Sequence, residues 1–140
     1  MTSAVPKIIQ FPKIGSNRGN LTFVEGSNHI PFDIARAFWI YEVPAGENRG
    51  SHAHYTLQEV VVAVSGSFDV TITDGFTERV FRLMRPYEGL YLPPGFWISL
   101  GNFAAGSVCV TLCSQPYDES DYIRNRRDYQ RLARANGPRW

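Results

Sequence analysis

The chain has 140 residues, which fits one domain over residues 1–140 because a second self-supporting core would need roughly 50–100 more. Hydrophobic residues make up 44% and charged residues 19%, which excludes a disordered chain. The formal net charge is +1, so no overall field attracts nucleic acid or an anionic membrane. No apolar run approaches the ~20 residues that span a bilayer, and no signal-peptide core is present, so we expect a cytoplasmic protein.

Short apolar or alternating segments recur between residues 34 and 114, and turn residues separate them. Ser65-Gly66 and Asp74-Gly75 stand where two-residue hairpin turns would lie, because glycine adopts the positive φ that such turns need. The expected strands are 34–43, 57–64, 67–73, 76–84, 90–93, 96–100 and 107–114. This rhythm indicates an all-β fold.

Two of these strands alternate clearly. Each is expected to turn one parity toward a common interior, namely Phe68, Val70 and Ile72 in the first and Val108, Val110 and Leu112 in the second. Many short, regularly spaced strands are typical of a closed barrel or sandwich. We therefore predict a jelly-roll barrel of short antiparallel strands.

The two ends of the chain are expected to differ from this core. In the N-terminal segment 1–26, residues 7–11 and 21–25 are strand-like, and their pairing stays open, including exchange across a dimer. Residues 118–135 are predicted to form a C-terminal helix, because capping and acidic residues precede a run in which Tyr122, Tyr129 and Ala133 fall near one face.

Three residues with reactive side chains lie outside any motif. Cys109 and Cys113 are four positions apart in an apolar run, which is neither a CxxC redox pair nor a zinc half-site. We expect them to be buried and inert. His29 has no motif around it and is expected in a loop or at the surface.

The segment around residues 46–66 carries the densest chemistry. Gly46, His52, His54, Glu59 and Gly66 satisfy the spacing G-x5-H-x-H-x3,4-E-x6-G of the first cupin motif. Histidines at i and i+2 of a strand project from the same face, which here is the barrel interior. The match predicts a cupin-type jelly-roll barrel with two imidazoles inside it.

Many cupins complete a metal site with a histidine from a second motif, P-x-G-x2-H-x3-N. Pro93, Gly95 and Asn102 keep that spacing, but Ile98 occupies the histidine position. An aliphatic side chain cannot donate to a metal, so we expect no metal and no other cofactor.

Two chemistries stay open for the histidine pair. Without a metal, two imidazoles suit general acid–base catalysis, because an ordinary histidine pKa near ~6.5 lets either ring exchange a proton at neutral pH. The alternative is a metal-dependent cupin that uses His52, His54 and Glu59 as ligands. Either Gln58 or Glu59 takes the inward position.

Longer segments resemble one family, the dTDP-sugar 3,4-ketoisomerases, which are cupin-fold enzymes of deoxysugar biosynthesis. The resemblance lies in RGSHAH (49–54), GLYLPPGFW (89–97) and YDESDYIRNRRDY (117–129), with SNRGNL (16–21) and NHIPFDIARAF (28–38) in the same order. It implies a homodimer that converts a dTDP-4-keto-6-deoxyhexose to its 3-keto isomer without a metal or redox cofactor.

The chemistry of such a substrate suggests roles for three residues. The hydrogen at C3 lies α to the C4 ketone, so a base can remove it to give an enediol(ate), which is then reprotonated at C4. We expect His54 to be the carbon base and His52 its partner in proton relay or enediolate stabilisation. Tyr91 is the candidate hydroxyl that contacts the substrate oxygens.

The nucleotide suggests further binding residues. A dTDP ligand carries a diphosphate, whose oxygens match the planar fork of an arginine, and the resemblance assigns this role to Arg18, Arg36 and Arg49. An aromatic ring could stack on thymine. The remaining substrate-binding candidates are Trp39, Trp97 and Gln58.

Two positions depart from the family pattern. Ile98 stands where the family commonly has histidine, and Phe38-Trp39 stands where it tends to have tyrosine. Both changes remove proton-carrying groups. The alternatives are therefore a slower isomerase, an isomerase of different stereochemistry, or a non-catalytic cupin that binds nucleotide sugars.

Overall fold

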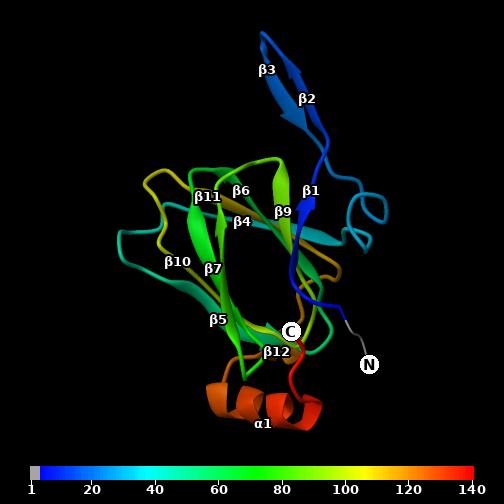
Figure 1. Cartoon of the computed structure of the whole chain (residues 1–140), viewed down its shortest axis with the longest axis vertical. Coiled ribbons are helices and arrows are strands. Elements are labelled where there is room, and N and C mark those ends of the chain that lie inside the picture. The colour runs from blue at the N-terminus through cyan, green and yellow to red at the C-terminus, as the bar shows by residue number, and fades with distance from the viewer. Residues whose placement is uncertain (1–3) are drawn as a thin grey trace.

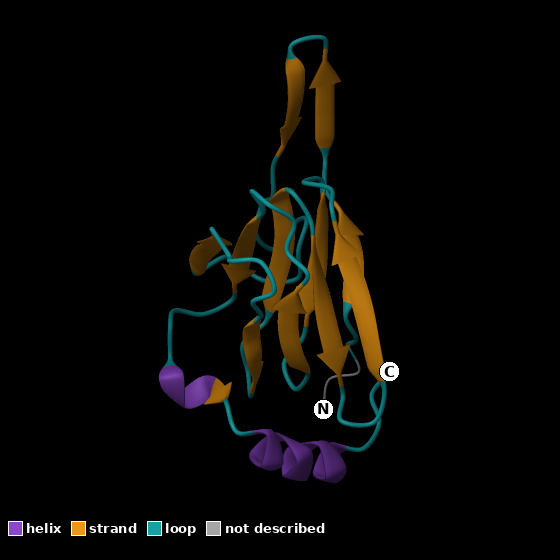
Figure 2. Ribbon diagram, turned by 90° about the vertical axis from the view of Figure 1, so that its left-hand side faces the viewer, coloured by secondary structure: helices purple, strands orange, loops and turns teal. Residues whose placement is uncertain are grey.

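The computed structural model describes residues 4–140, so residues 1–3 of the expected N-terminal segment lie outside the described residues. Two five-stranded antiparallel sheets form the body of the molecule (Figures 1 and 2). One sheet has the order β1 (Lys7–Gln10), β9 (Glu88–Leu92), β6 (Glu59–Ser65), β11 (Val108–Cys113) and β4 (Arg36–Tyr41). The other has the order β12 (Tyr122–Ile123), β5 (Arg49–His54), β10 (Trp97–Gly101), β7 (Phe68–Thr73) and β8 (Glu78–Leu83). The predicted all-β, cupin-type fold is confirmed.

Apolar side chains from both sheets form one central core. Phe68, Val70 and Ile72 of β7 are fully buried, as their alternation predicts, and they share this core with Val61 of β6 and Leu90 of β9. Each such side chain contributes about 1.5–3 kcal/mol through burial. The core packs the two sheets against each other.

The predicted inward face of β11 is wrong. Cys109, Thr111 and Cys113 are buried, whereas Val110 and Leu112 are half-buried on the outer face. Both parities of this strand carry apolar groups, so alternation did not distinguish the two faces. Both cysteines are free and buried, as expected, and burial raises the pKa of each thiol to about 12.

A separate hairpin projects from the barrel at the top of Figure 1. It consists of β2 (Lys13–Ser16) and β3 (Gly19–Thr22), which pair only with each other. The sequence predicted one strand at 21–25 here, and missed the hairpin. The other N-terminal run is a strand as expected, since β1 pairs with β9 of the same chain. His29 lies in the following loop, where its Nδ1 accepts a hydrogen bond from the Glu25 N–H.

The C-terminal helix begins later than predicted. The helix α1 spans Arg126–Asn136, and a 3-10 helix η1 (Glu119–Asp121) and the short strand β12 precede it. Asp118 caps η1, while Asn125 caps α1 by accepting two backbone N–H bonds. The segment therefore has two capped helix starts, and only the second, at Asn125, leads into a long helix. Within residues 4–140 no helix is long and apolar enough to cross a membrane.

Helix α1 packs across one end of the barrel (Figure 1). Tyr129 and Ala133 are buried against a cluster that includes Trp97. The Tyr129 hydroxyl lies 2.9 Å from the carbonyl oxygens of both Thr73 and Gly95. These contacts anchor the helix, and β12 just before it pairs with β5.

Candidate active site

A cavity of about 470 Å³ opens between the two sheets. This volume suits a small-molecule ligand. Its apolar lining is Phe38, Trp39, Ile40, Val61, Ile98 and Leu100, and its polar lining includes Asn48, Arg49, Ser51, His52, Glu59, Thr111, Tyr122 and Arg124. Polar and apolar side chains thus line the pocket in similar measure, and the polar ones come from both sheets.

A β-bulge in β5 directs His52 into this cavity. Gly50 and Ser51 have φ values of 86° and 63°, and the pairing of β5 with β10 shifts register between Ile98 and Ser99. Ser51 is the extra residue of the bulge, and His52 directly after it pairs with Ile98. The bulge interrupts the alternation of the strand just before the histidine pair.

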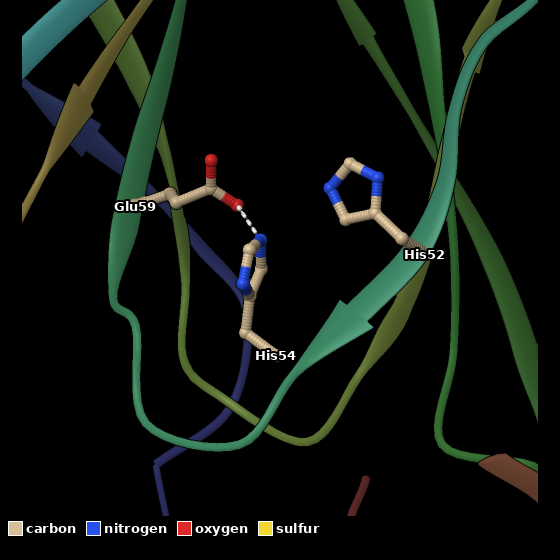
Figure 3. Close-up of side chains that lie close together, drawn as sticks. All are labelled: His52, His54 and Glu59. Carbon is tan, nitrogen blue, oxygen red and sulfur yellow. Dashed lines mark ion pairs between the residues drawn. The ribbon is translucent and has the colours of Figure 1, made fainter. Parts of the chain in front are cut away.

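His52 and His54 lie on the same side of β5, as their spacing predicts (Figure 3). Their ring centroids are 5.0 Å apart, and the Tyr122 ring packs against both. Ala53 between them faces the cluster under α1. His52 lines the cavity, whereas His54 is 4% exposed and does not. The two imidazoles are therefore not equivalent, because only His52 faces the cavity directly.

Glu59, and not Gln58, takes the inward position. Its Oε1 lies 3.7 Å from His54 Nε2, and its carboxyl lines the cavity (Figure 3). Gln58 points elsewhere, and its Oε1 accepts a 2.7 Å hydrogen bond from the Tyr91 hydroxyl. Tyr91 and Gln58, both predicted to contact substrate, thus lie outside the lining of this cavity: Tyr91 packs in the cluster with Phe11 and Val60, and Gln58 lies in the loop just before β6.

Asp121 of η1 holds the loop that follows His54. Its carboxylate accepts hydrogen bonds from the Thr56 N–H (2.9 Å), the Thr56 hydroxyl (2.6 Å) and the Leu57 N–H (3.0 Å). The oxygen that accepts from Leu57 also lies 3.3 Å from His54 Nδ1. Because a carboxylate only accepts, the proton of a neutral His54 belongs on Nδ1, and Nε2 faces Glu59 with its lone pair.

Burial sets the charge of these groups. Desolvation, with the charge of Arg124, lowers the pKa of His52, and desolvation, with the charge of His52, lowers the pKa of His54 to about 4. Desolvation raises the pKa of Glu59 to about 7, against the opposing charge of Arg36. At neutral pH the site therefore holds neutral imidazoles beside a carboxyl that can keep its proton.

Ring nitrogens in the site lack partners. His52 Nδ1 and His54 Nε2 are buried and make no hydrogen bond within residues 4–140, and the nearest acceptor to the buried His54 Nδ1 is the Asp121 carboxylate at 3.3 Å. One ligand atom each from His52, His54 and Glu59 lie within 4.8 Å of one another, so these side chains could also hold a metal ion. The same cluster thus suits proton transfer or metal binding.

The three predicted arginines lie in three different places. Arg49 lines the cavity. Arg36 lies behind the site, against the ring of Tyr117, and does not line the cavity. Arg18 is in the turn of the projecting hairpin. Arg124, which was not predicted, lines the cavity, and Glu119 holds its guanidinium with bonds of 2.6 and 2.9 Å.

The predicted aromatic residues also separate. Trp39 lines the cavity and is 61% exposed, so a ring could stack on it. Trp97 is buried beneath α1 and does not line the cavity. Tyr122, Arg124 and Asp121 were not predicted as site residues, because their segment was expected to belong to the C-terminal helix. The run YDESDYIR was noted as a resemblance, and that was the available signal.

Comparisons with known proteins agree with this geometry. Residues 4–134 match the family described as "FdtA: WxcM-like, C-terminal". A curated relative from Aneurinibacillus thermoaerophilus, TDP-4-oxo-6-deoxy-alpha-D-glucose-3,4-oxoisomerase, is 37% identical over 131 residues, which is 93% of this chain and 94% of that protein.

Solved structures give the same result. A histidine mutant of the 3,4-ketoisomerase QdtA from Thermoanaerobacterium thermosaccharolyticum, in complex with TDP-4-keto-6-deoxyglucose, has a TM-score of 0.92 and 35% identity, covering 93% of this chain and 94% of that one. The TDP-quinovose 3,4-ketoisomerase WlaRB from Campylobacter jejuni has a TM-score of 0.86 and 36% identity, covering 90% and 97%. A dTDP-4-dehydrorhamnose 3,5-epimerase from Bacillus anthracis, at 15% identity and a TM-score of 0.74, shares the fold.

Proposed function

Because this chain belongs to the dTDP-sugar 3,4-ketoisomerase family, we propose that it converts a dTDP-4-keto-6-deoxyhexose to the 3-keto isomer through an enediol(ate), by histidine acid–base catalysis and without a metal. The observation that carries this proposal is the neutral His52 imidazole in the wall of a 470 Å³ cavity, beside the Glu59 carboxyl. A base and an acid within one pocket are what enolisation needs.

His52 is the carbon base in this proposal. Its ring lines the cavity, and its lowered pKa keeps it unprotonated at neutral pH. It removes the proton from C3 and returns it to C4 on the same face of the enediol(ate). The sequence pattern favoured His54 for this role, but His54 is buried behind the cavity lining, which favours His52. Ile98 in the cavity wall carries no proton.

The substrate's nucleotide would bind at the open side of the cavity. Arg49 and Arg124 both line it and offer guanidinium groups to the diphosphate. Trp39 provides an exposed ring for the thymine. Arg36 does not reach this surface and acts on the buried groups instead.

We also propose a homodimer. The hairpin of β2 and β3 exposes the large apolar side chains Ile14 and Leu21, which are 60% and 57% exposed. Packing of this hairpin on a second copy would cover them and would bring Arg18 to that copy. Sedimentation of the protein before and after Leu21→Glu tests this: a dimer that the substitution dissociates supports it, and a monomeric parent protein refutes it.

The decisive experiment follows dTDP-4-keto-6-deoxyglucose by proton NMR in D2O with chelator-treated protein. We expect loss of the C3 proton signal and formation of a 3-keto product. His52→Asn should abolish both. If His54→Asn abolishes them and His52→Asn does not, His54 is the carbon base. If the ligand binds without exchange or product, the chain is a nucleotide-sugar-binding protein.

A metal-dependent reaction is the second candidate, since His52, His54 and Glu59 could hold an ion. Elemental analysis of the purified protein, and activity before and after the chelator, separate it from the first. Activity that disappears with the chelator and returns with one added metal would support this candidate.

A further inference from the structure

The proposed reaction moves two protons, not one. One proton leaves C3 and arrives at C4, and a second leaves the oxygen on C3 and arrives at the oxygen on C4. His52 can carry the first, because its neutral ring regains its original state when it reprotonates C4. The second proton needs a carrier that starts the cycle protonated.

Glu59 occupies the position that such a carrier needs. It lies at the start of β6, in the sheet opposite that of His52, so that the two side chains face each other across the cavity (Figure 3). The residue is 5% exposed, and within residues 4–140 its only ion-pair partner is His54. A buried carboxyl that lines a ligand cavity without a cation in contact favours its protonated form.

His54 and Asp121 support Glu59 from behind. Asp121 holds the proton of His54 on Nδ1, so the lone pair of Nε2 faces Glu59 Oε1 at 3.7 Å. A protonated Glu59 can donate to this nitrogen, and an ionised Glu59 can be reprotonated there. Tyr122 also lines the cavity, but its ring packs against both imidazoles and does not face the Nε2 lone pair of His54 as Glu59 does.

We propose that Glu59 is the second proton carrier and serves the two substrate oxygens; this inference rests on the proposed isomerase function. In the first half-reaction, His52 takes the proton from C3 while the Glu59 carboxylic acid protonates the C4 oxygen, which gives a neutral enediol. In the second, protonated His52 delivers its proton to C4 while the Glu59 carboxylate takes the proton from the C3 oxygen. Both residues return to their initial state, and no co-reactant is consumed.

The charges around Glu59 agree with this assignment. The groups that face it are Arg36 of β4, the histidines of β5, Asp121 of η1 and the two thiols of β11. Desolvation outweighs the charge of Arg36 and raises the pKa of Glu59 to about 7. An acid with this pKa can both give and take a proton at neutral pH.

The substitution Glu59→Gln tests the proposal, because the amide keeps the shape of the side chain and cannot transfer a proton. In D2O, two rates are measured by proton NMR with dTDP-4-keto-6-deoxyglucose: exchange at C3 and formation of the 3-keto product. We expect product formation to fall at least 100-fold and C3 exchange less than tenfold, since the amide still hydrogen-bonds the enolate oxygen. Glu59→Asp should recover part of the product formation.

The pH profile supplies a readout that a structural role would not change. Activity of the wild-type protein should fall above pH ~7 as Glu59 loses its proton, and Glu59→Gln should lack that limb. Glu78→Gln, on the exposed strand β8, is the matched control and should behave as wild type. Product formation by Glu59→Gln within threefold of wild type, or equal losses of both rates, would overturn the proposal. A wild-type protein with neither exchange nor product would instead refute the isomerase function.

Discussion

Replacement of Asp121 by asparagine should weaken both the fold and the chemistry of the site. One carboxylate oxygen accepts from the backbone and hydroxyl of Thr56, and the other accepts from the Leu57 N–H. In Asp121→Asn the amide oxygen can keep the Thr56 bonds, but its NH2 group then faces the buried Leu57 N–H. That donor loses its partner, and no carboxylate remains beside His54 Nδ1.

The magnitude follows from the lost bonds. A hydrogen bond to a charged acceptor contributes about 1.5–3 kcal/mol, and a buried donor without a partner costs about 1–3 kcal/mol. These costs overlap, so we expect the free energy of unfolding to fall by roughly 2–4 kcal/mol. At about 4 °C per kcal/mol for a domain of this size, the Tm should fall by roughly 8–16 °C.

The same substitution should change the pH dependence of activity. The proton of His54 would move to Nε2 and donate toward Glu59 Oε1, which favours the ionised carboxylate and lowers the pKa of Glu59. The basic limb of the pH–rate profile should therefore shift to lower pH. Urea denaturation and the profile are measured for Asp121→Asn and for the exposed control Asp128→Asn. Unchanged stability together with an unchanged basic limb would refute the reasoning.

Three further predictions concern single groups. Between pH 4.5 and about 7, Glu59 loses its proton in the unfolded chain but keeps it in the folded protein, because folding raises its pKa. The free energy of unfolding should therefore fall by roughly 3 kcal/mol as pH rises through that window. Urea midpoints at pH 5 and 8 should show this fall in wild type and a smaller one in Glu59→Gln. Arg124→Gln should weaken TDP binding at least tenfold by calorimetry, whereas the exposed helix variant Arg134→Gln should not. Tyr129→Phe should lower the free energy of unfolding by about 1–2 kcal/mol, because its buried hydroxyl bond is lost; a change below 0.5 kcal/mol would contradict this.

The motif around the histidines predicted the fold and the shared face of the two histidines correctly, because strand spacing alone determines that face. His52 and His54 two positions apart on a strand must share a face, and both lie on the inner side of β5. The choice between Gln58 and Glu59 could not be made from the sequence. It depends on where β6 begins after the loop, and the Asp121 carboxylate fixes that loop from a distant segment.

Residues of β11 and of the segment before α1 were misplaced because the sequence offered two alternatives of similar strength in each, namely two apolar parities in the strand and two helix caps in the segment. Val110 and Leu112 were predicted to face the core from β11, but the opposite parity faces inward. Both faces of the strand carry apolar side chains, and Leu112 packs against a second cluster on the outer face, so alternation did not distinguish the two faces. Asp118 is a good helix cap, and it does cap a helix, but only the three-residue η1. A second cap at Asn125 begins α1, so the residues between the caps were free to reach the active site.

The weak attachment of segment 119–124 determines how the protein loses activity. The segment joins the barrel through the two-residue pairing of β12 with β5 and through the Asp121 carboxylate, whereas the strands of the central core are paired along their lengths. Segments held by few bonds open locally at a lower free-energy cost than the whole domain. Amides near the histidine pair should thus exchange with solvent sooner than those of β7. Mild denaturant would inactivate the enzyme while its barrel is still folded. Residual secondary structure is therefore a poor measure of residual activity.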